Sequence, residues 1–429
     1  MKILYILVAI LILLVLITVH ELGHYLAGKL LKFKINEFSI GFGKAIYKKE
    51  MKSGELFAIR VVPLGGYCAF EGEDEDNPSP GAFNNQKPWK RMIVLAAGVT
   101  FNFIFGVITA AIYLMIAGYS VPVVSFFAPS MTDSPFKVGD RIVAVEGVTI
   151  EAYRNFSSLT SKYAENEEFS VTVERLVDGK YEIVVLDNVK KVKNNAFYFA
   201  SKMSIDKKIY KNVNDQPVEV SLDEFNEFLL TLAVTKDEKG KYNKPILNSE
   251  TVKFYKAKEM TENDEYTNEE LYNLVGVAIS GDGVSLGFVN SHESMKYGFF
   301  ESLLKAWPFC FYLAITILSA LAGIFTGATG LAELGGTITA IGQMAEVASW
   351  GFSQFLLLFP LLSVNLALFN FLPIPALDGA RTLFVGAEAV IGRPINRKVE
   401  GWIHTIGLFV LFGLVIFLDG YHIISGFLK

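Results

Sequence analysis

Two histidines and a glutamate stand at the end of a long apolar run near the N-terminus. The run covers 3–19, and the stretch ITVHELGHYL overlaps its end and contains His20, Glu21 and His24. On a helix, positions i and i+4 lie on one face, so both imidazoles could bind one metal ion. Zinc lowers the pKa of a bound water to about 7, and Glu21 is placed to take its proton. The spacing therefore predicts the centre of a zinc hydrolase.

The apolar surroundings separate this motif from a chance match. The alternative is a pair of buried histidines that only form hydrogen bonds, since short motifs do match by chance. Ionisable side chains are costly in hydrocarbon, and an intramembrane ionisable residue is functional by default. We therefore predict that His20 and His24 bind metal and that Glu21 is the catalytic base.

A catalytic zinc usually takes three protein ligands and keeps one open position. Asp378, in the stretch NFLPIPALDGAR, ends a late apolar run, and Pro373 and Pro375 break the helix before it. His404 is a second candidate, at the start of the last apolar segment. Asp378 could instead lie in solvent at a plain helix end. The sequence favours Asp378 as the third ligand.

The segments that carry these residues are typical of a membrane protein. The chain has 429 residues, is 52% hydrophobic and has a net charge of −5, so nothing suggests nucleic-acid binding. Its two cysteines lie far apart, which indicates neither a disulfide framework nor a thiolate zinc site. Segments long enough to span about 30 Å of hydrocarbon occupy 3–31, 91–118, 299–326, 352–376 and 402–428.

Basic loops set the expected topology. The loops 32–91 and 381–398 are rich in Lys and Arg, which places both in the cytoplasm. Both can be cytoplasmic only if 299–326 lies in the membrane interface rather than spanning it, and its charged and aromatic start suits that place. We therefore expect about four spans, with 120–298 outside the cytoplasm.

A β region is expected between the first two spans. The stretch ELFAIRVVPLGGYCAF predicts strands broken by Pro63, Gly65 and Gly66, and SIGFGK has the glycine spacing of a bend. Non-helical backbone at membrane depth is tolerated only beside protein or a wet cavity. A hairpin that dips into the membrane beside the active site and a hairpin in the cytoplasm both fit.

HELGH in the first span, together with N-x-x-P-x-P-x-L-D-G in a late span, resembles the site-two protease family of zinc intramembrane metalloproteases. The single central insert and the total length are similar to the bacterial subgroup that cleaves membrane-bound anti-sigma factors and leftover signal peptides. The resemblance implies that His20, His24 and Asp378 are ligands of Zn²⁺ and that Glu21 is the catalytic base.

The resemblance also implies substrate contacts. Asn370 matches the family asparagine that contacts the substrate backbone. SIGFGK, with Gly41, Phe42 and Gly43, resembles a membrane-dipping hairpin whose edge strand is proposed to pair with substrate. AAGVTFNFIFG resembles the second-span pattern G-P-x-x-N-F and keeps its asparagine, Asn102, which the resemblance assigns to the substrate site. Valine replaces the proline of that pattern, and alanine replaces the second glycine after the late aspartate.

The central block resembles a PDZ module. SPFKVGDRIVAVEGVTI matches the family pattern of a turn, then G-D-x-I, then a strand and hairpin, and its β-branched residues agree with a strand. PDZ grooves bind peptides by strand addition. The stretch 190–270 exceeds what a PDZ module needs, so we interpret it as an insertion before a closing strand at 274–279.

The sequence thus predicts a mainly α-helical transmembrane core with a membrane-associated β-hairpin and an extracytoplasmic PDZ-like α+β domain. The expected parts are 1–119 with the first two spans and the β region, 120–290 with the PDZ-like domain and its insertion near 190–270, 291–351 with an interfacial helix and a Gly-rich loop, and 352–429 with the last spans and the LDG motif.

The expected function is regulated intramembrane proteolysis by a zinc endopeptidase that spans a bacterial plasma or inner membrane several times. Its expected partners are transmembrane substrate proteins and peptides and the lipid bilayer, with no nucleic acid. Two alternatives stay open, a catalytically inactive adaptor that binds zinc or peptides and a zinc transporter. The intact Glu21 argues against the first, and the few polar residues in the other spans argue against the second.

Overall fold

The computed structural model describes residues 2–73, 79–129, 131, 133–202, 207–327 and 335–427. The chain divides into two compact units, which we describe separately. One unit joins the two ends of the chain, 1–118 and 296–429, and is mainly helical. The other unit, 119–295, contains β-sheets and short helices.

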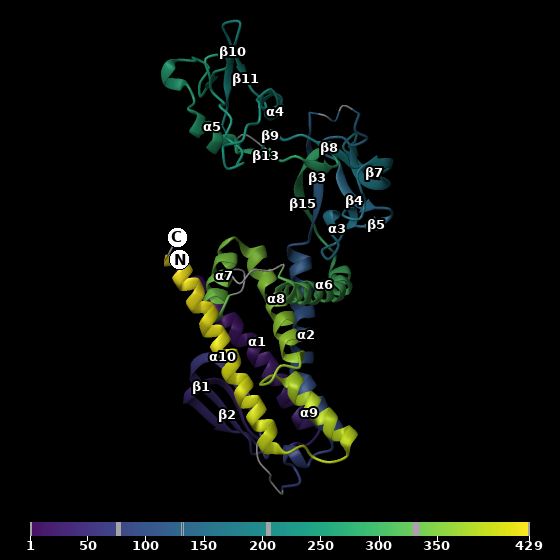
Figure 1. Ribbon diagram of the computed structural model, residues 1–429, viewed down its shortest axis with the longest axis vertical. Helices are drawn as coiled ribbons and strands as arrows, with labels where there is room; N and C mark the ends of the chain where they lie inside the picture. The colour runs from purple at the N-terminus through teal and green to yellow at the C-terminus, as the bar shows by residue number, and fades with distance from the viewer. Residues whose placement is uncertain are drawn as a thin grey trace. The chain divides into compact units, whose positions relative to one another are not determined.

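The helical unit is built around α2, which packs against α1, α6, α8 and α9 (Figure 1). Its helices are α1 (Lys2–Leu30), α2 (Pro88–Ile116), α6 (Phe299–Thr326), α7 (Thr337–Ser349), α8 (Phe352–Phe371), α9 (Asp378–Ile391) and α10 (Arg397–Phe427). α7 packs on α1, where Met344 and Ala348 meet Ala9 and Leu16. Much of the expected Gly-rich loop, 328–334, lies outside the described residues.

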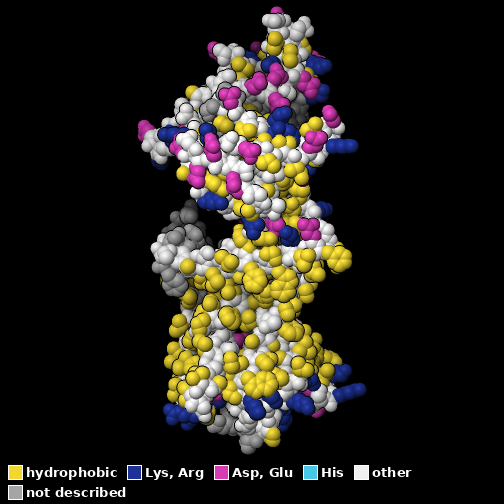
Figure 2. Space-filling view, turned by 90° about the vertical axis from the view of Figure 1, so that its right-hand side faces the viewer, with side chains coloured by type: hydrophobic (Ala, Val, Ile, Leu, Met, Phe, Trp, Pro, Cys, Tyr) yellow, Lys and Arg dark blue, Asp and Glu magenta, His cyan; other side chains and the backbone are white. Residues whose placement is uncertain are grey.

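The surface of the helical unit is apolar, as a membrane requires. Among the described residues, five helices are long and apolar enough to cross a membrane: 3–30, 88–116, 299–324, 352–371 and 397–422. Figure 2 shows hydrophobic side chains over much of the visible surface of this unit, with Lys and Arg gathered at one end. An exposed apolar surface of this extent is typical of a membrane or interaction surface.

Helix α6 crosses α2 steeply (Figure 1). Phe103 of α2 contacts Trp307 and Phe311, whereas Tyr113 of α2 stacks on Phe309. Positions 103 and 113 are about 15 Å apart along α2, but 307 and 311 are only about 6 Å apart along α6. The contacts are widely spaced along α2 but closely spaced along α6, so the two helix axes must cross at a steep angle. The crossing agrees with an interfacial α6, and the number of spans stays a prediction.

The expected β region is present between α1 and α2. It consists of β1 (Ile35–Glu50) and β2 (Leu56–Phe70). β1 bends at Gly41 and Gly43, whose φ angles of +85° and +83° favour glycine. Residues 37–40 of β1 pair with 56–59 of β2 along one edge and with 66–69 of β2 along the other. The two bent strands thus form a compact sheet.

The second unit has a sheet in the order β15-β3-β4-β6-β7, with β5 paired to β4. Val121, Ile142 and Val171 are among the buried side chains of its core. The elements of this part are β3 (Tyr119–Phe127), β4 (Arg141–Val145), β5 (Val148–Thr149), α3 (Phe156–Thr160), β6 (Glu168–Val177), β7 (Lys180–Lys190), β8 (Val192–Asn194), β14 (Gly283–Ser285) and β15 (Phe288–Met295).

The rest of this unit forms a second core of its own, which includes Phe225, Phe254 and Leu271. This separate core agrees with the interpretation of the segment as an insertion. Its elements are β9 (Phe197–Ala200), β10 (Tyr210–Val213), β11 (Gln216–Glu219), α4 (Leu222–Leu230), β12 (Phe254–Tyr255), α5 (Asn268–Val275) and β13 (Val277–Ser280), and 3-10 turns occur here at Glu262–Asp264 and in the helical unit at Phe83–Asn85.

The prediction that 274–279 closes the sheet is wrong. A capping box formed by Thr267 and Glu270 starts helix α5, which continues through 275, and β13 then pairs with β9. The closing strand is β15, which pairs antiparallel with β3. Residues 277–279 do form a strand, but Leu274 and Val275 end helix α5, because a short apolar run fits one face of a helix as well as a strand.

Candidate metal centre and active site

His20 and His24 lie one turn apart on α1, both buried against α2. The two helices approach closely because each has a glycine at the contact. A Cβ at Gly23 would lie 2.5 Å from the carbonyl oxygen of Ala97, and one at Gly98 would lie 2.4 Å from His24 Nε2. Only glycine leaves room for both backbones and for the imidazoles at this crossing.

Asp378 comes from the far end of the chain, at the start of α9. Helix α8 ends at 371, and the prolines that follow prevent it from continuing. The chain turns back sharply, since a Cβ at Gly379 would lie 2.3 Å from the carbonyl oxygens of Phe371 and Leu372. The glycine after the aspartate therefore permits the tight turn that brings the carboxylate back to α1.

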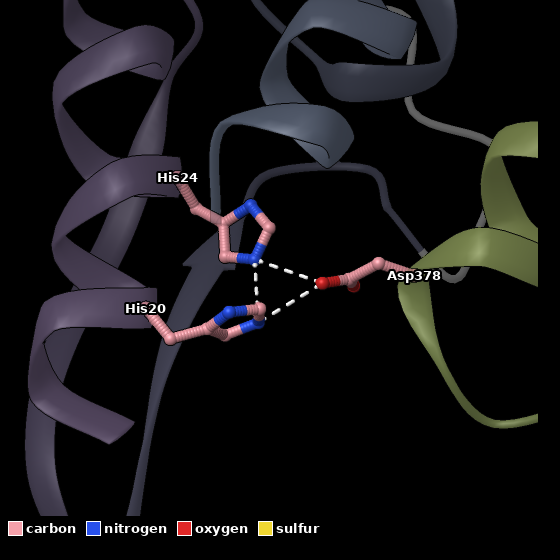
Figure 3. Close-up of side chains that lie close together, drawn as sticks. All are labelled: His20, His24 and Asp378. Atoms are coloured by element: carbon pink, nitrogen blue, oxygen red, sulfur yellow. Dashed lines mark hydrogen bonds and ion pairs between the residues drawn. The ribbon is translucent and has the colours of Figure 1, made fainter. Parts of the chain in front are cut away.

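The three predicted ligands meet, as Figure 3 shows. Asp378 Oδ2 lies 3.0 Å from His20 Nε2 and 3.2 Å from His24 Nε2. The two Nε2 atoms are 3.2 Å apart. Among the described residues, these three form the group of metal-binding side chains that could hold an ion. The preference for Asp378 over a solvent-exposed helix end agrees with this geometry.

The donor set fits a tetrahedral metal ion. His24 Nδ1 lies 2.8 Å from the carbonyl oxygen of Val94, which fixes the proton on Nδ1 and leaves a lone pair on Nε2. Asp378 Oδ2 is buried and has no hydrogen-bond donor within the described part of the chain. Zinc bonds of 2.0–2.1 Å at tetrahedral angles separate neighbouring ligand atoms by about 3.3 Å. Three electron-pair donors at 3.0–3.2 Å match that spacing, and a cation would relieve their repulsion.

Asn102 lies behind His20 and is fully buried. Its side-chain nitrogen is 3.3 Å from His20 Nδ1, while its Oδ1 has no partner within the described residues. If His20 binds a metal through Nε2, its proton lies on Nδ1. The side-chain amide of Asn102, turned by 180°, would then accept that proton with Oδ1. Asn102 is therefore placed to orient His20, whereas its assignment to the substrate site stays a prediction.

Two cavities adjoin the three ligands, and Glu21 lines both. The smaller cavity has a volume of about 230 Å³, and Asn370 lies in its wall beside Glu21 and Asp378. The larger has a volume of about 330 Å³ and is lined on one side by residues 67–70 of β2. Glu21 and Asn370 thus lie next to the metal ligands, as the sequence predicted.

The strand next to the centre was not predicted in detail. Residues 66–69 of β2 pair with β1 on one side, and a Cβ at Gly66 would lie 3.6 Å from Cγ of Glu21. The predicted contacts Gly41, Phe42 and Gly43 lie at the bend of β1, with Phe42 opposite Val62 and 44% exposed. The larger of the two cavities is lined by residues 67–70 of β2, and neither cavity is lined by 41–43. The only sequence sign was the strand-like stretch GGYCAF.

His404, the rival third ligand, lies outside the group of three. Its Nδ1 accepts a hydrogen bond of 2.9 Å from the backbone N–H of Ala376. Ala376 has a φ of +80°, which a non-glycine residue rarely adopts. His404 therefore holds the strained loop that precedes Asp378 rather than the metal ion.

The chain is similar to known proteases over most of its length. The profile of Peptidase family M50 matches residues 8–414. The "Regulator of sigma E protease" of Haemophilus influenzae is 28% identical over 423 residues, which cover 94% of this chain and 95% of that protein. The "Regulator of sigma-E protease RseP" of Escherichia coli is 26% identical and covers 94% of this chain and 96% of its own. The "Putative zinc metalloprotease" of Vibrio cholerae is 27% identical, with 94% of each chain covered.

Proposed function

The chain belongs to peptidase family M50 and is a metalloprotease, and from that premise we propose that it is a zinc endopeptidase that cleaves transmembrane segments within the membrane. The observation that carries the proposal is the meeting of His20, His24 and Asp378 inside apolar helices. A soluble protease would have no reason to bury its metal ligands among helices of this length and hydropathy.

Glu21 is the general base of the proposed reaction. Bound zinc would polarise the scissile carbonyl and lower the pKa of the attacking water to about 7. Glu21 lines both cavities beside the ligands, so its carboxylate can accept the proton of that water and pass it to the leaving amine. Asn370, in the smaller cavity, can donate an amide hydrogen bond to the substrate backbone or to the developing oxyanion.

The substrate binds as an added strand. A peptide bond in a transmembrane helix is already hydrogen-bonded within the helix, so the helix must unwind before cleavage. Residues 66–69 of β2 have one side unpaired within the described sheet and border the larger cavity. An unwound segment can replace its lost helical hydrogen bonds by pairing with this edge.

The protein lies in a bacterial plasma or inner membrane, with 119–295 outside the cytoplasm. Its substrates are membrane-bound anti-sigma factors and remnant signal peptides, by analogy with relatives whose names state that they regulate sigma E. Unit 119–295 acts as a PDZ-like peptide-binding module. In support, Gly139 has a φ of +90°, and the buried Asp140 forms an ion pair with Arg175 before strand β4.

The proposal is tested by Glu21→Gln in the full-length protein. The substitution preserves size but removes the base, so cleavage of a transmembrane peptide should fall by at least about 100-fold. Zinc content, measured by mass spectrometry of the purified protein, should stay near that of the wild type, and bound substrate should co-purify. Glu301→Gln, at an exposed position of α6, is the matched control and should keep full activity.

Two outcomes would contradict the proposal. Cleavage by Glu21→Gln near the wild-type rate would exclude this residue as the general base. Loss of zinc would mean that Glu21 is a ligand, and its role would have to be reassigned.

A further inference from the structure

A third cavity of about 430 Å³ lies among α2, α9 and α10, and it shares Leu95 and Arg381 with the larger cavity beside the candidate ligands. Its wall is amphipathic, because aliphatic and guanidinium side chains face the same space. The aliphatic residues are Leu95, Val385 and Leu408, and the guanidinium groups belong to Arg91, Arg381 and Arg397. None of the three arginines is needed for the hydrolysis derived above.

Arg91 is the most unusual member of this wall. It is only 3% exposed and forms an ion pair with the buried carboxylate of Glu388 through Nη2. Its Nε and Nη1 have no acceptor among the residues that the structure describes. A buried guanidinium donor without an acceptor is unfavourable, so an oxygen-bearing group is expected beside it.

The other charges of the cavity are balanced. Arg381 pairs with Glu73, and Arg397 pairs with Glu388 and Glu400. Within the described part of its wall, the cavity has a balanced charge but no acceptor oxygen for Arg91 Nε or Nη1. A phosphodiester suits this need, because it carries a single charge and offers several acceptor oxygens, and arginine binds phosphate oxygens well.

The place of the cavity points to a lipid as the source of the phosphate. Arg91 lies in the first turn of α2, and Arg397 begins α10. Both helices start at the lower end of the helical unit in Figure 1, and Figure 2 shows Lys and Arg gathered at that end. Most of α10 beyond this point exposes apolar side chains that acyl chains can cover. Basic pockets between transmembrane helices are known to bind lipid headgroups. We propose that the cavity binds the phosphodiester headgroup of a phospholipid.

This site adjoins the loop that carries a metal ligand. His404 lines the cavity and accepts the hydrogen bond from Ala376, two residues before Asp378. Three residues further along α10, a Cβ at Gly407 would lie 2.4 Å from Cβ of Pro375. A bound headgroup would therefore steady α10 where it packs on the loop before Asp378.

Native mass spectrometry of the full-length, zinc-loaded protein tests the proposal. The probe is palmitoyl-oleoyl phosphatidylglycerol, and diacylglycerol with the same acyl chains is the control that lacks phosphate. Gly401 lines the cavity, and a Cβ there would meet no described atom within 4 Å, so Gly401→Leu should fill the cavity without a clash. Gly413→Leu, at an equally open position of the same helix away from the cavity, is the matched control.

The wild type and Gly413→Leu should each retain one phosphatidylglycerol in preference to diacylglycerol. Gly401→Leu should lose at least about tenfold in its affinity for phosphatidylglycerol. The double variant Arg91→Gln/Glu388→Gln keeps the charge balance and should lose the preference for the phosphate-bearing lipid. Equal binding by all variants would overturn the proposal, as would a cavity that retains no lipid and holds only water. Binding of inorganic phosphate as tight as that of the lipid would overturn the lipid assignment and leave a free-phosphate site.

Discussion

A single methyl group added to α2 should disable the metal centre. In Gly98→Ala, the new Cβ would lie 2.4 Å from His24 Nε2 and 2.7 Å from His20 Cε1. Ordinary contacts between such atoms begin near 3.5 Å, so α2 must move by about 1 Å or both imidazoles must turn. The His24 ring has little freedom to turn, because its Nδ1 is bonded to the carbonyl oxygen of Val94.

A displacement of this size exceeds what the metal tolerates. Ligand distances in zinc sites stay within about 0.2 Å of their ideal values, and a misplacement of about 1 Å can cost 100-fold in rate. We therefore expect Gly98→Ala to bind zinc at least about 100-fold more weakly and to lose activity in parallel, although alanine favours the helix by about 1 kcal/mol.

The assay is a zinc competition titration against a chelator, followed by peptide cleavage at saturating zinc. Gly106→Ala is the control on the same helix, since its Cβ would meet the side chain of Val364 at 3.1 Å and no metal ligand. Gly98→Ala with wild-type zinc affinity would refute the reasoning, because it would mean that the close packing of α2 on the imidazoles does not determine the site.

Three further predictions test the ligand set and the topology. Asp378→Ala should purify with far less zinc, whereas His404→Ala should keep about one equivalent; the reverse result by metal analysis would make His404 the third ligand. Asn102→Leu should weaken zinc binding by about 10- to 100-fold, as expected for a residue that orients a ligand, and Asn102→Asp should restore most of it; equal zinc affinity in all three proteins would contradict this role. In a background without native cysteines, a cysteine at Ser349 should label from outside the cell and one at Asn396 only from the cytoplasm, and labelling of 349 from inside would mean that α6 spans the membrane.

The meeting of the three candidate ligands could be anticipated because the motifs that carry them are local in the sequence. HELGH sets its own geometry on a helix, and the prolines before Asp378 mark the end of α8 within the sequence itself. The roles of Asn102 and His404 could not be found this way. Asn102 meets His20 through the packing of α2 on α1, and His404 meets Ala376 through the return of α10, which no spacing in the sequence encodes.

The strands were predicted more securely than their partners. The non-helical pattern of 34–70, with its Pro and Gly breaks, indicated β structure. Which segment borders Glu21 depends on how β1 bends at Gly41 and Gly43. In 274–279 the pattern misled at its start, because Leu274 and Val275 fit a strand and the end of a helix equally well. The capping box at Thr267 was the local sign that favoured the helix.

The ligands of the centre come from segments at opposite ends of the chain, with the whole of 119–295 between them. A metal ion bound by α1 and by the start of α9 would therefore also cross-link these two segments and close the long loop of chain between them. It would join the first helix to the turn after α8 at the point where His20 Nε2, His24 Nε2 and Asp378 Oδ2 face one another at 3.0–3.2 Å. Loss of the metal would then turn an attraction into a repulsion at this junction, and a protein deprived of zinc would be loosened as well as inactive.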